Sequence, residues 1–219
     1  MKFSWQTLFS SFPPLLEAAW VNLSLAVIIF LLVLVFSTGF TLLRARKNVW
    51  LGRAFAVLIS FVRGTPLLIQ IFICYYVLPA LGLDLSPTAA GIIAITLNST
   101  IFLAEAMRGG LGTLDPGHIE AAAALGLRPR AIWQCVVLPQ LFRRMIPVIV
   151  NEATIIVKGT ALLSVITVVD VLRTAQQIAG GNYRPFETLL GAALIFLVIN
   201  LAFSAIGSYL EARVADARV

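Results

Sequence analysis

Two long apolar runs constrain this sequence more than any other feature. Val21–Leu43 and Thr188–Leu210 contain no Asp, Glu, Lys or Arg. Each is longer than the about 20 apolar residues that a helix needs to cross the hydrocarbon core of a bilayer. Inside that core every backbone polar group must be satisfied within the protein, and an α-helix does this within one segment. We therefore expect the chain to cross a membrane as helices.

The composition indicates a membrane protein along the whole length of the chain. Of the 219 residues, 60% are hydrophobic and 12% are charged, and the mean hydropathy is +0.97. Soluble domains are more charged and less apolar. Three further apolar segments are long enough to span, although each contains or reaches a charged residue: Arg63, Glu105 or Lys158. We predict an all-α membrane protein with one polytopic domain, residues 1–219, and five transmembrane helices at about 18–43, 54–79, 87–108, 145–170 and 188–210.

The basic residues are unevenly divided between the two faces of this predicted bundle. The net charge is +6. The larger group follows the first span, surrounds the segment 109–144 and ends the chain. Its members are Arg44, Arg46, Lys47, Arg53, Arg108, Arg128, Arg130, Arg143, Arg144, Arg213 and Arg218. Lys2, Arg173 and Arg184 fall on the other face. Loops rich in Lys and Arg stay in the cytoplasm, so we predict an outside N-terminus, a cytoplasmic C-terminus and a cytoplasmic loop 109–144. Because this distribution fits membrane orientation, we expect no nucleic acid partner.

The polar loop contains a segment that reads as two short helices, DPGHIEAAAALGLRPRAIWQCVVLP. Asp115 is suited to cap a helix that begins at Pro116, because its side chain accepts a free backbone N–H and proline fits the first helical position. The alanine run favours helix, and Gly126 can end it in the left-handed conformation. A second helix is expected to start at Pro129 and to end at Pro139. A long loop in a compact protein is usually functional.

The second predicted span is interrupted by Arg63-Gly64-Thr65-Pro66, followed by Gln70. A charged residue inside a span usually faces the protein interior or an aqueous cavity, and Gly and Pro weaken the helix at the same place. One interpretation is a discontinuity near a transport pathway. The other is that Arg63 extends to the cytoplasmic interface and that the Gly-Pro pair only bends the helix.

Other polar residues also fall within predicted spans. Asn98 lies about 17 Å along its helix from Pro87, near the middle of the bilayer. Glu105 is placed to pair with Arg108 at i, i+3. Glu152 needs a partner from another helix, the interface or a ligand, since an unpaired charge there is costly. The resulting candidates for a substrate pathway are Arg63, Gln70, Asn98, Ser99, Glu152 and Asp170.

Three segments carry structural expectations only. Residues 1–14 are either a short amphipathic helix on the outer leaflet or a loosely ordered terminus. Asn22, near the outer end of the first span, is expected to join helices by hydrogen bonds. Residues 173–185 are expected to form an outer loop that turns at 180–182, where two glycines precede an asparagine.

The polar loop resembles the EAA loop of the membrane permease subunits of bacterial ABC importers. That pattern is Glu-Ala-Ala, three residues, Gly, nine residues, Ile, one residue and Leu-Pro. The matching residues here are Glu120, Ala121, Ala122, Gly126, Val136 in the Ile position, Leu138 and Pro139. The polar amino acid uptake group is indicated by further segments: Arg63 to Pro66 with Gln70, Asn98-Ser99 with Glu105 and Arg108-Gly109, and Asn151 with Lys158 and Thr160.

The resemblance implies a fold, partners and a location. The fold would be that of a type I ABC importer permease in the bacterial cytoplasmic (inner) membrane. The partners would be a cytoplasmic ABC ATPase dimer, a second permease that is identical or homologous, and an extracytoplasmic substrate-binding protein. This chain would hold no cofactor, and ATP and Mg would bind to the ATPase. Glu120, Ala121, Ala122, Gly126, Leu138 and Pro139 would form the ATPase-coupling site.

The function implied is ATP-driven import of a polar amino acid. Acidic Glu152 and Asp170 favour a cationic amino acid as the narrower expectation. The alternative is an ion-coupled secondary transporter or small channel that uses the carboxylates of Glu105, Glu152 and Asp170 within the membrane. An enzyme is not expected, because the sequence contains no GxxxxGK[ST], HExxH or GxSxG motif.

Overall fold

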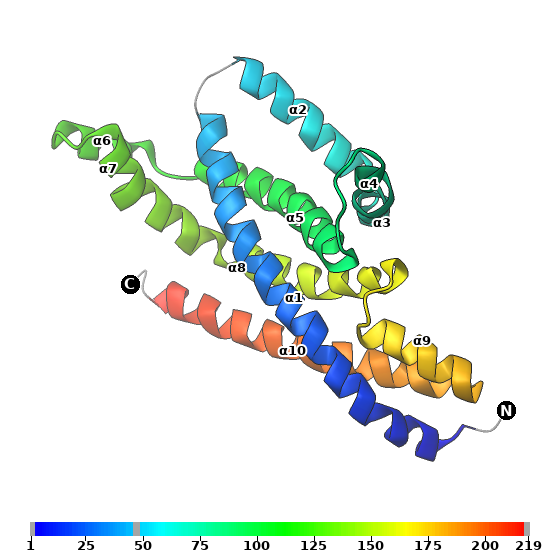
Figure 1. The fold of residues 1–219 in the computed structure, drawn as a ribbon. Coiled ribbons are helices and arrows are strands. Elements are labelled where there is room, and N and C mark those ends of the chain that lie inside the picture. The colour runs from blue at the N-terminus through cyan, green and yellow to red at the C-terminus, as the bar shows by residue number, and fades with distance from the viewer. Residues whose placement is uncertain (1–2, 46–48, 217–219) are drawn as a thin grey trace.

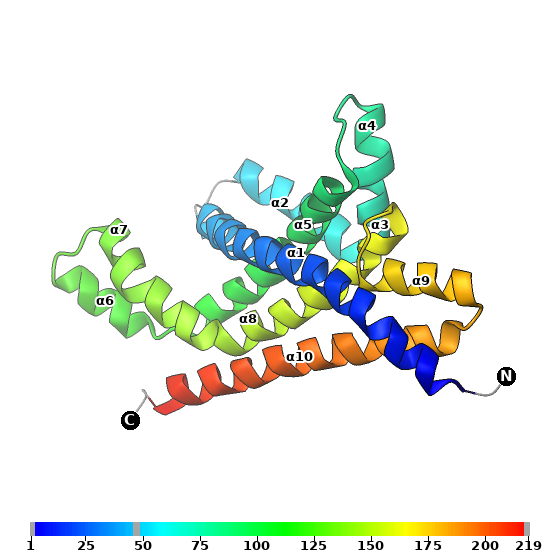
Figure 2. The same cartoon turned by 60° about the horizontal axis from the view of Figure 1, so that its bottom comes forward.

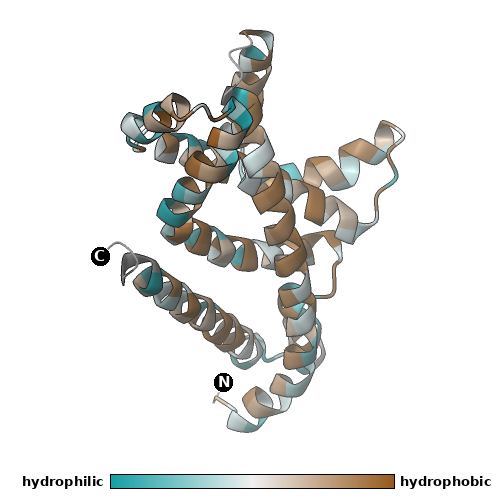
Figure 3. Ribbon diagram, turned by 90° about the vertical axis from the view of Figure 1, so that its left-hand side faces the viewer, coloured by the Kyte–Doolittle hydropathy of each residue, from teal (hydrophilic) through white to brown (hydrophobic). Residues whose placement is uncertain are grey.

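A computed structural model describes residues 3–45 and 49–216, and every regular element within these ranges is helical (Figure 1). Four stretches are long and apolar enough to cross a membrane: Trp5–Arg44, Pro87–Leu111, Pro129–Ile166 and Pro185–Arg213. A bent pair of helices, Val49–Gly64 with Leu67–Ala80, gives a fifth if it counts as one span. The long helices are coloured mainly as hydrophobic in Figure 3. The all-α membrane fold is thus confirmed. Lys2, Arg46, Lys47 and Arg218, used in the charge argument, lie outside the described ranges.

The first helix, α1 (Trp5–Ala45), is longer than the predicted span and contains Pro13 and Pro14. For the described part of residues 1–14, the expectation of a loose terminus is wrong. The expected helix forms, but it is continuous with the first span instead of separate from it. The reason is tertiary packing, because Leu15 on this part of α1 is completely buried together with Val171 and Ala192. These contacts hold the proline-containing turns in line with the rest of the helix.

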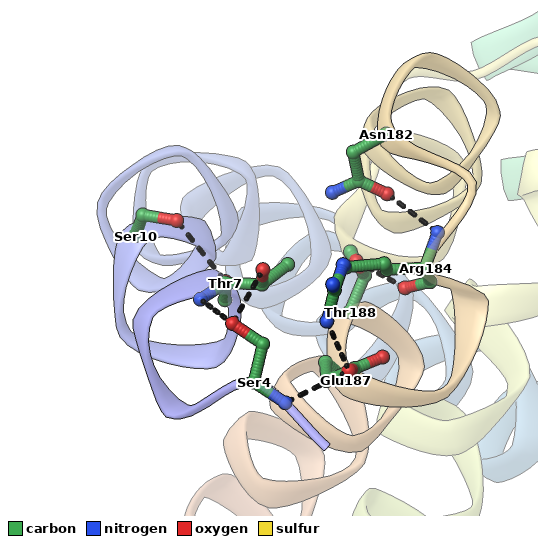
Figure 4. Close-up of polar contacts among 7 residues, drawn as sticks. All are labelled: Ser4, Thr7, Ser10, Asn182, Arg184, Glu187 and Thr188. Carbon is green, nitrogen blue, oxygen red and sulfur yellow. Dashed lines mark hydrogen bonds and ion pairs between the residues drawn. The ribbon is translucent and has the colours of Figure 1, made fainter. Parts of the chain in front are cut away.

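The start of α1 is also tied to the turn before α10 (Pro185–Asp216), as Figure 4 shows. The Ser4 backbone N–H donates to Oε1 of Glu187 at 3.0 Å. Arg184 donates to the same carboxylate oxygen at 3.2 Å, and its own backbone N–H is bound by the Asn182 side chain. One carboxylate therefore joins the beginning of the chain to the beginning of its last helix.

The second predicted span is broken, as one of the two interpretations of its sequence required. Helix α2 (Val49–Gly64) and the helical segment that starts with α3 (Leu67–Phe72) meet at an angle of 111°. Pro66 between them is extended, with φ −61° and ψ 143°. Proline lacks a backbone N–H and disfavours helical geometry in the residue before it, so the helix cannot continue through this point.

Two wide helical turns each precede a Leu-Pro pair. The π-helical turn η1 (Ile73–Val77) leads into α4 (Leu78–Ala80), and η2 (Trp133–Val137) leads from α7 (Pro129–Ile132) into α8 (Leu138–Thr160). In each, the leucine N–H donates to a carbonyl five residues earlier. A wider turn removes the clash between a proline ring and the carbonyl four residues before it.

One consequence corrects the sequence analysis. The second short helix, expected to end at Pro139, instead continues without interruption into α8, because η2 accommodates the proline. The loop helix and the long helix are therefore one mechanical unit, which extends through the 3₁₀ turn η3 (Ala161–Ile166).

The core lies between α1, α5 (Pro87–Leu111) and α8. Ile29 and Val33 of α1 and Ile95 and Met107 of α5 are at most 1% exposed and belong to one apolar cluster. Helix α10 packs on α8 at a point where no side chain fits, because a Cβ added to Gly207 would lie 2.1 Å from Cγ1 of Val150. Small residues at such crossings let membrane helices approach closely.

Residues 173–185, expected to form a loop, are helical up to Asn182. Helix α9 (Val171–Asn182) is capped by the Asp170 side chain, which accepts the N–H of Arg173 at 2.8 Å. The predicted glycine turn at 180–182 falls inside the last turn of α9, and the chain reverses at Tyr183, whose φ is +55°. Apolar residues on one face of α9, among them Val171 and Ala175, are fully buried, and this burial outweighs the low helix propensity of the glycines.

Candidate functional site

A helical hairpin projects from one end of the bundle, away from α9 and the N-terminal end of α1 (Figure 2). It consists of α6 (Pro116–Ala124), a turn at residues 125–128 and α7, and we call it the α6–α7 hairpin. The C-terminal end of α10 lies at the same end of the molecule in Figures 1 and 2. This hairpin contains the residues that match the Glu-Ala-Ala pattern.

The first helix of the hairpin starts as its sequence predicts. Asp115 is the N-cap, its carboxylate accepts the N–H of Gly117 at 2.9 Å, and Pro116 occupies the first helical position. A side-chain acceptor at this place is worth about 0.5–2 kcal/mol to a helix. Glu120, in contrast, is exposed on the outer surface of α6. The cap therefore leaves Glu120 available to another molecule.

Gly126 closes the first helix in the left-handed conformation, with φ +77°. The Leu127 N–H donates to the Ala122 carbonyl at 3.2 Å, and the Gly126 N–H donates to the Ala123 carbonyl at 2.9 Å. This pair of bonds is the Schellman arrangement, in which a glycine avoids the steric penalty that other residues meet. The predicted helix end is confirmed at this residue.

A small apolar cluster holds the two arms of the hairpin together. Ala122 of α6 is 6% exposed and packs with Leu114, Ile132 and Val137. Ala121, the preceding residue, is exposed. The two alanines therefore differ in environment, since Ala122 fixes the hairpin and Ala121 belongs to its free surface. Leu138 is partly buried and Pro139 exposed, where the hairpin passes into α8.

The free surface of the hairpin contains two large apolar side chains that the sequence analysis did not select. Leu125 is 81% exposed and Ile119 is 40% exposed. The sequence feature that could have indicated this surface is Leu125, a large apolar residue between the alanine run and the glycine that ends the helix. Exposed apolar residues on a projecting element often mark a surface for another protein.

Two of the predicted pathway residues, Gln70 and Asn98, form hydrogen bonds at the break between α2 and α3. The Gln70 amide group donates to the carbonyls of Val62 and Thr65 at 2.9 and 3.1 Å and to the Thr65 hydroxyl at 3.0 Å. Its oxygen accepts from the Asn98 side chain at 3.1 Å. Gln70 is 3% exposed, so these contacts satisfy carbonyls that the break leaves without helical partners.

Ser99 and Glu152 meet between α5 and α8. Their exposed fractions are 2% and 7%, and the Ser99 hydroxyl interacts with the Glu152 carboxyl group. Lys158, six residues after Glu152 on α8, is exposed. Arg63, at the end of α2, is also exposed. The structure thus joins Gln70 to Asn98 by a hydrogen bond, buries Ser99 and Glu152 near each other between α5 and α8, and leaves Arg63 outside both pairs.

Asp170 belongs to a separate buried network. Asn22 of α1 donates to the Thr160 hydroxyl at 2.9 Å and to the Asp170 carboxylate at 3.2 Å, and its oxygen accepts the Val171 N–H at 3.0 Å. Asn22, Thr160 and Asp170 are completely buried. The predicted role of Asn22 in joining helices is confirmed, and Asp170 uses its oxygens inside the protein.

Glu105 has two cationic partners. It pairs with Arg108 at 3.1 Å, as the sequence predicts, and it also forms an ion pair with Arg44 from the end of α1. The hydroxyl and backbone carbonyl of Thr113 are both bound by Arg144 of α8 near the base of the hairpin. Ion pairs therefore join α1 to α5, and hydrogen bonds join α8 to the turn after α5, at the end that carries the α6–α7 hairpin.

Comparison with known proteins identifies this arrangement. Residues 37–216 match the family described as binding-protein-dependent transport system inner membrane component. The chain is 35% identical over 219 residues to the glutamine transport system permease protein GlnP of Escherichia coli (strain K12), covering 97% of this chain and 98% of that one. It is 33% identical over 205 residues to the arginine transport system permease protein ArtQ of Bacillus subtilis (strain 168), covering 92% of each. It is 35% identical to the nopaline transport system permease protein NocM of Agrobacterium fabrum, covering 91% of this chain and 87% of that one.

Solved structures have the same fold. A crystal structure of an amino acid ABC transporter with histidines superposes with a TM-score of 0.88 and 29% identity, covering 97% of this chain and all of that one. A chain of the inward-facing MetNI methionine ABC transporter superposes with a TM-score of 0.76, but at 16% identity it shows the fold alone. By sequence over most of its length and by fold over nearly all of it, this chain belongs to the family of inner membrane components of binding-protein-dependent transport systems, the membrane permease subunits of ABC importers.

Proposed function

We propose that this permease imports a polar amino acid, with the α6–α7 hairpin facing the cytoplasm and receiving the movement of a separate ATPase. The observation that carries the proposal is the hairpin itself, a self-packed element with an exposed apolar tip that continues directly into the spanning helix α8. Such an element moves as a rigid body, and rigid-body movement can switch a membrane bundle between two states.

We select the residues that would contact the ATPase by the exposure of their side chains on the hairpin. Leu125 and Ile119 supply apolar area, Ala121 allows close approach because its side chain is small, and Glu120 offers a charge for a basic group of the ATPase. Gly126 sets the angle of the turn, Ala122 packs the two arms together, and Leu138 and Pro139 lie where the hairpin passes into α8. ATP and Mg would bind to the ATPase. The ATPase would close as a dimer and bind two such hairpins, one from each permease.

The complete transporter would contain a second permease, identical or homologous, and an extracytoplasmic binding protein. We place the N-terminus outside and the C-terminus in the cytoplasm, because the basic residues Arg128, Arg130, Arg143 and Arg144 lie on or next to the α6–α7 hairpin, and positively charged loops stay inside. The C-terminal end of α10 lies at that same end of the bundle.

The substrate class rests on the relatives and on buried polar groups. The relatives named above transport glutamine, arginine and nopaline, by their names. An amino acid needs an acceptor for its ammonium group and donors for its carboxylate. Glu152 with Ser99 is the best placed acceptor, and Arg63 and Asn98 are the candidate donors, since Gln70 already uses its amide hydrogens on Val62 and Thr65. A cationic amino acid is the narrower proposal and now depends on Glu152, since Asp170 is bound by Asn22 and by the Arg173 N–H.

The ion-coupled alternative is weaker on structural grounds. A proton-carrying carboxylate must be able to lose its partner during each cycle, whereas Glu105 is held by both Arg44 and Arg108. The comparisons with known proteins favour the ABC importer as well.

Uptake by proteoliposomes that contain the permease, its ATPase and its binding protein distinguishes the two mechanisms. We expect labelled arginine or glutamine to enter only when ATP is present on the ATPase side, and a proton gradient without ATP to drive no uptake. Uptake that persists on the proton gradient alone would favour the secondary transporter. Competition by unlabelled amino acids gives the substrate class, and preference for glutamate would contradict a cationic substrate.

A further inference from the structure

A deep apolar groove runs between α1 and α5 on the outside of the bundle. Its volume is about 610 Å³, and its walls include Val35, Phe36 and Gly39 of α1 and Ile93 and Leu97 of α5. Val35, Phe36 and Ile93 are 68%, 55% and 43% exposed, so no described part of the chain covers them. An apolar concavity of this size in a membrane protein is a binding site for an apolar group.

The groove offers nothing to a polar ligand. Two of its lining residues, Thr96 and Thr100, have hydroxyl groups, but both hydroxyl oxygens are buried and make no hydrogen bond within the described part of the chain. Water would need two or more polar partners to be held there. The exposed wall is therefore hydrocarbon in character from end to end.

One end of the groove is cationic. A smaller pocket of about 150 Å³ lies one turn further along α5 and at the level of the last groove residue on α1, Leu43, with Arg44 from α1 and Arg108 from α5 in its lining. Both arginines pair with Glu105, so two positive charges face one negative charge. The Arg108 side chain is 60% exposed and the Arg44 side chain 26% exposed. A positive charge thus remains available to an anion at this end.

The length of the groove matches one leaflet. From Leu32, the first α1 residue in its lining, to Arg44 is about 18 Å at 1.5 Å per residue, and half of a bilayer core is about 15 Å. The cationic pocket lies at the end of α1 and α5 that also carries the α6–α7 hairpin. The groove therefore begins near the middle of the membrane and ends at a headgroup region.

We propose that this groove binds one anionic phospholipid, with an acyl chain between α1 and α5 and the headgroup phosphate at Arg44 and Arg108. Arginine is well suited to phosphate, because its guanidinium group donates two parallel hydrogen bonds. A helix of another protein chain would fill the same apolar space without using the cations, and the test below distinguishes this occupant from a lipid.

The test is lipid binding by the permease purified in its transporter complex. Palmitoyl-oleoyl phosphatidylglycerol or phosphatidylcholine is titrated into the delipidated complex, and bound lipid is counted by native mass spectrometry. Gly39→Leu is the blocking variant, because a Cβ at Gly39 meets no atom within 4 Å and its side chain would occupy the groove. Gly52→Leu is its control on α2, where a Cβ also meets nothing within 4 Å.

The headgroup is tested separately. We expect Arg108→Gln to weaken phosphatidylglycerol binding about fivefold, the effect of one cation near a membrane surface, and to leave phosphatidylcholine binding unchanged. Arg143→Gln, an exposed cation on α8 outside the pocket lining, is expected to bind both lipids as the unmodified permease does. This arm keeps the test valid if Gly39→Leu does not assemble.

The expected result is a preference for phosphatidylglycerol that Gly39→Leu abolishes and Gly52→Leu preserves. Equal binding of the two lipids by the unmodified permease, or unchanged binding by Gly39→Leu, would overturn the proposal. It would also fail if benzoylphenylalanine at position 39 crosslinks to another protein chain of the complex instead of lipid, since the groove would then be a protein interface.

Discussion

At the scale of single residues, the shape of the α6–α7 hairpin depends on Gly126. Its φ of +77° allows the chain to reverse after α6 while two backbone hydrogen bonds close the helix. A Cβ at this position would meet no other atom within 4 Å, so the demand for glycine comes from the backbone alone. Left-handed geometry costs a residue other than glycine about 1–3 kcal/mol.

Replacing Gly126 tests this demand. Gly126→Val is expected to reopen the turn, because a β-branched residue is strongly disfavoured at positive φ, whereas Gly126→Asn is expected to be tolerated. We expect the valine variant to insert into the membrane but to lose ATPase association in a pull-down, together with uptake. The asparagine variant should retain both. Equal ATPase association by the two variants would contradict this role of the glycine.

The buried network around Asn22 is the second feature at this scale. Asn22 supplies partners to Thr160, Asp170 and the Val171 N–H. Asn22→Leu removes three hydrogen bonds and leaves the buried Val171 N–H without a partner, at a cost of about 1–3 kcal/mol. Thr160 and Asp170 keep their contacts with the Val157 carbonyl and the Arg173 N–H. We expect a fall of several degrees in the melting temperature of the purified permease. The control is Ser24→Ala, which removes only a hydroxyl bonded to its own helix at Val21. A melting temperature equal to that of the control would show that the network contributes nothing to stability.

At the scale of elements, the patterns in the sequence were informative where local chemistry decides the outcome. The cap at Asp115, the turn at Gly126 and the break at Pro66 depend on a few neighbouring residues. The first two were predicted, and the break was one of two interpretations of its sequence. The continuous α1, the helix α9 and the passage through Pro139 depend on packing partners distant in the chain, or on a π-helical turn that has no simple sequence signature.

For the candidate site too, some features were predictable from the sequence and others required the structure. Motif spacing identified Glu120 and Gly126, but exposure identified Leu125, because periodicity does not say which apolar residues remain uncovered. The polar residues of the spans were found from their cost in a membrane. Their partners, Gln70 with Asn98 and Asp170 with Asn22, required the three-dimensional arrangement.

The crossing of α8 and α10 allows a test of helix packing. Gly207→Ala would place a Cβ 2.1 Å from Cγ1 of Val150, so the helices would have to separate. We expect a lower melting temperature for Gly207→Ala and partial recovery in the double variant Gly207→Ala with Val150→Ala, which removes the opposing methyl groups. Additive effects of the two substitutions would indicate that the two residues do not share this contact.

At the scale of the whole molecule, the two ends of the bundle have different characters. One end carries the α6–α7 hairpin, the ion pairs of Glu105 and the contact of Arg144 with Thr113. The other end carries α9 and the N-terminal part of α1, tied together through Glu187 and the Asn22 network. Because α8 runs continuously from the hairpin into the bundle, we propose that it carries movement of the hairpin to Glu152.

The central claim is that the tip of the α6–α7 hairpin receives the movement of the ATPase, and Leu125→Glu tests it most directly. Leu125 is 81% exposed, and Leu81→Glu provides a matched control, since Leu81 is 73% exposed and follows α4, which lies away from the α6–α7 hairpin. The measurement is ATP-driven amino acid uptake by reconstituted transporter, with ATPase association recorded in parallel. We predict that Leu125→Glu loses both and that Leu81→Glu retains both, and uptake by Leu125→Glu at the level of the unmodified transporter would contradict the account.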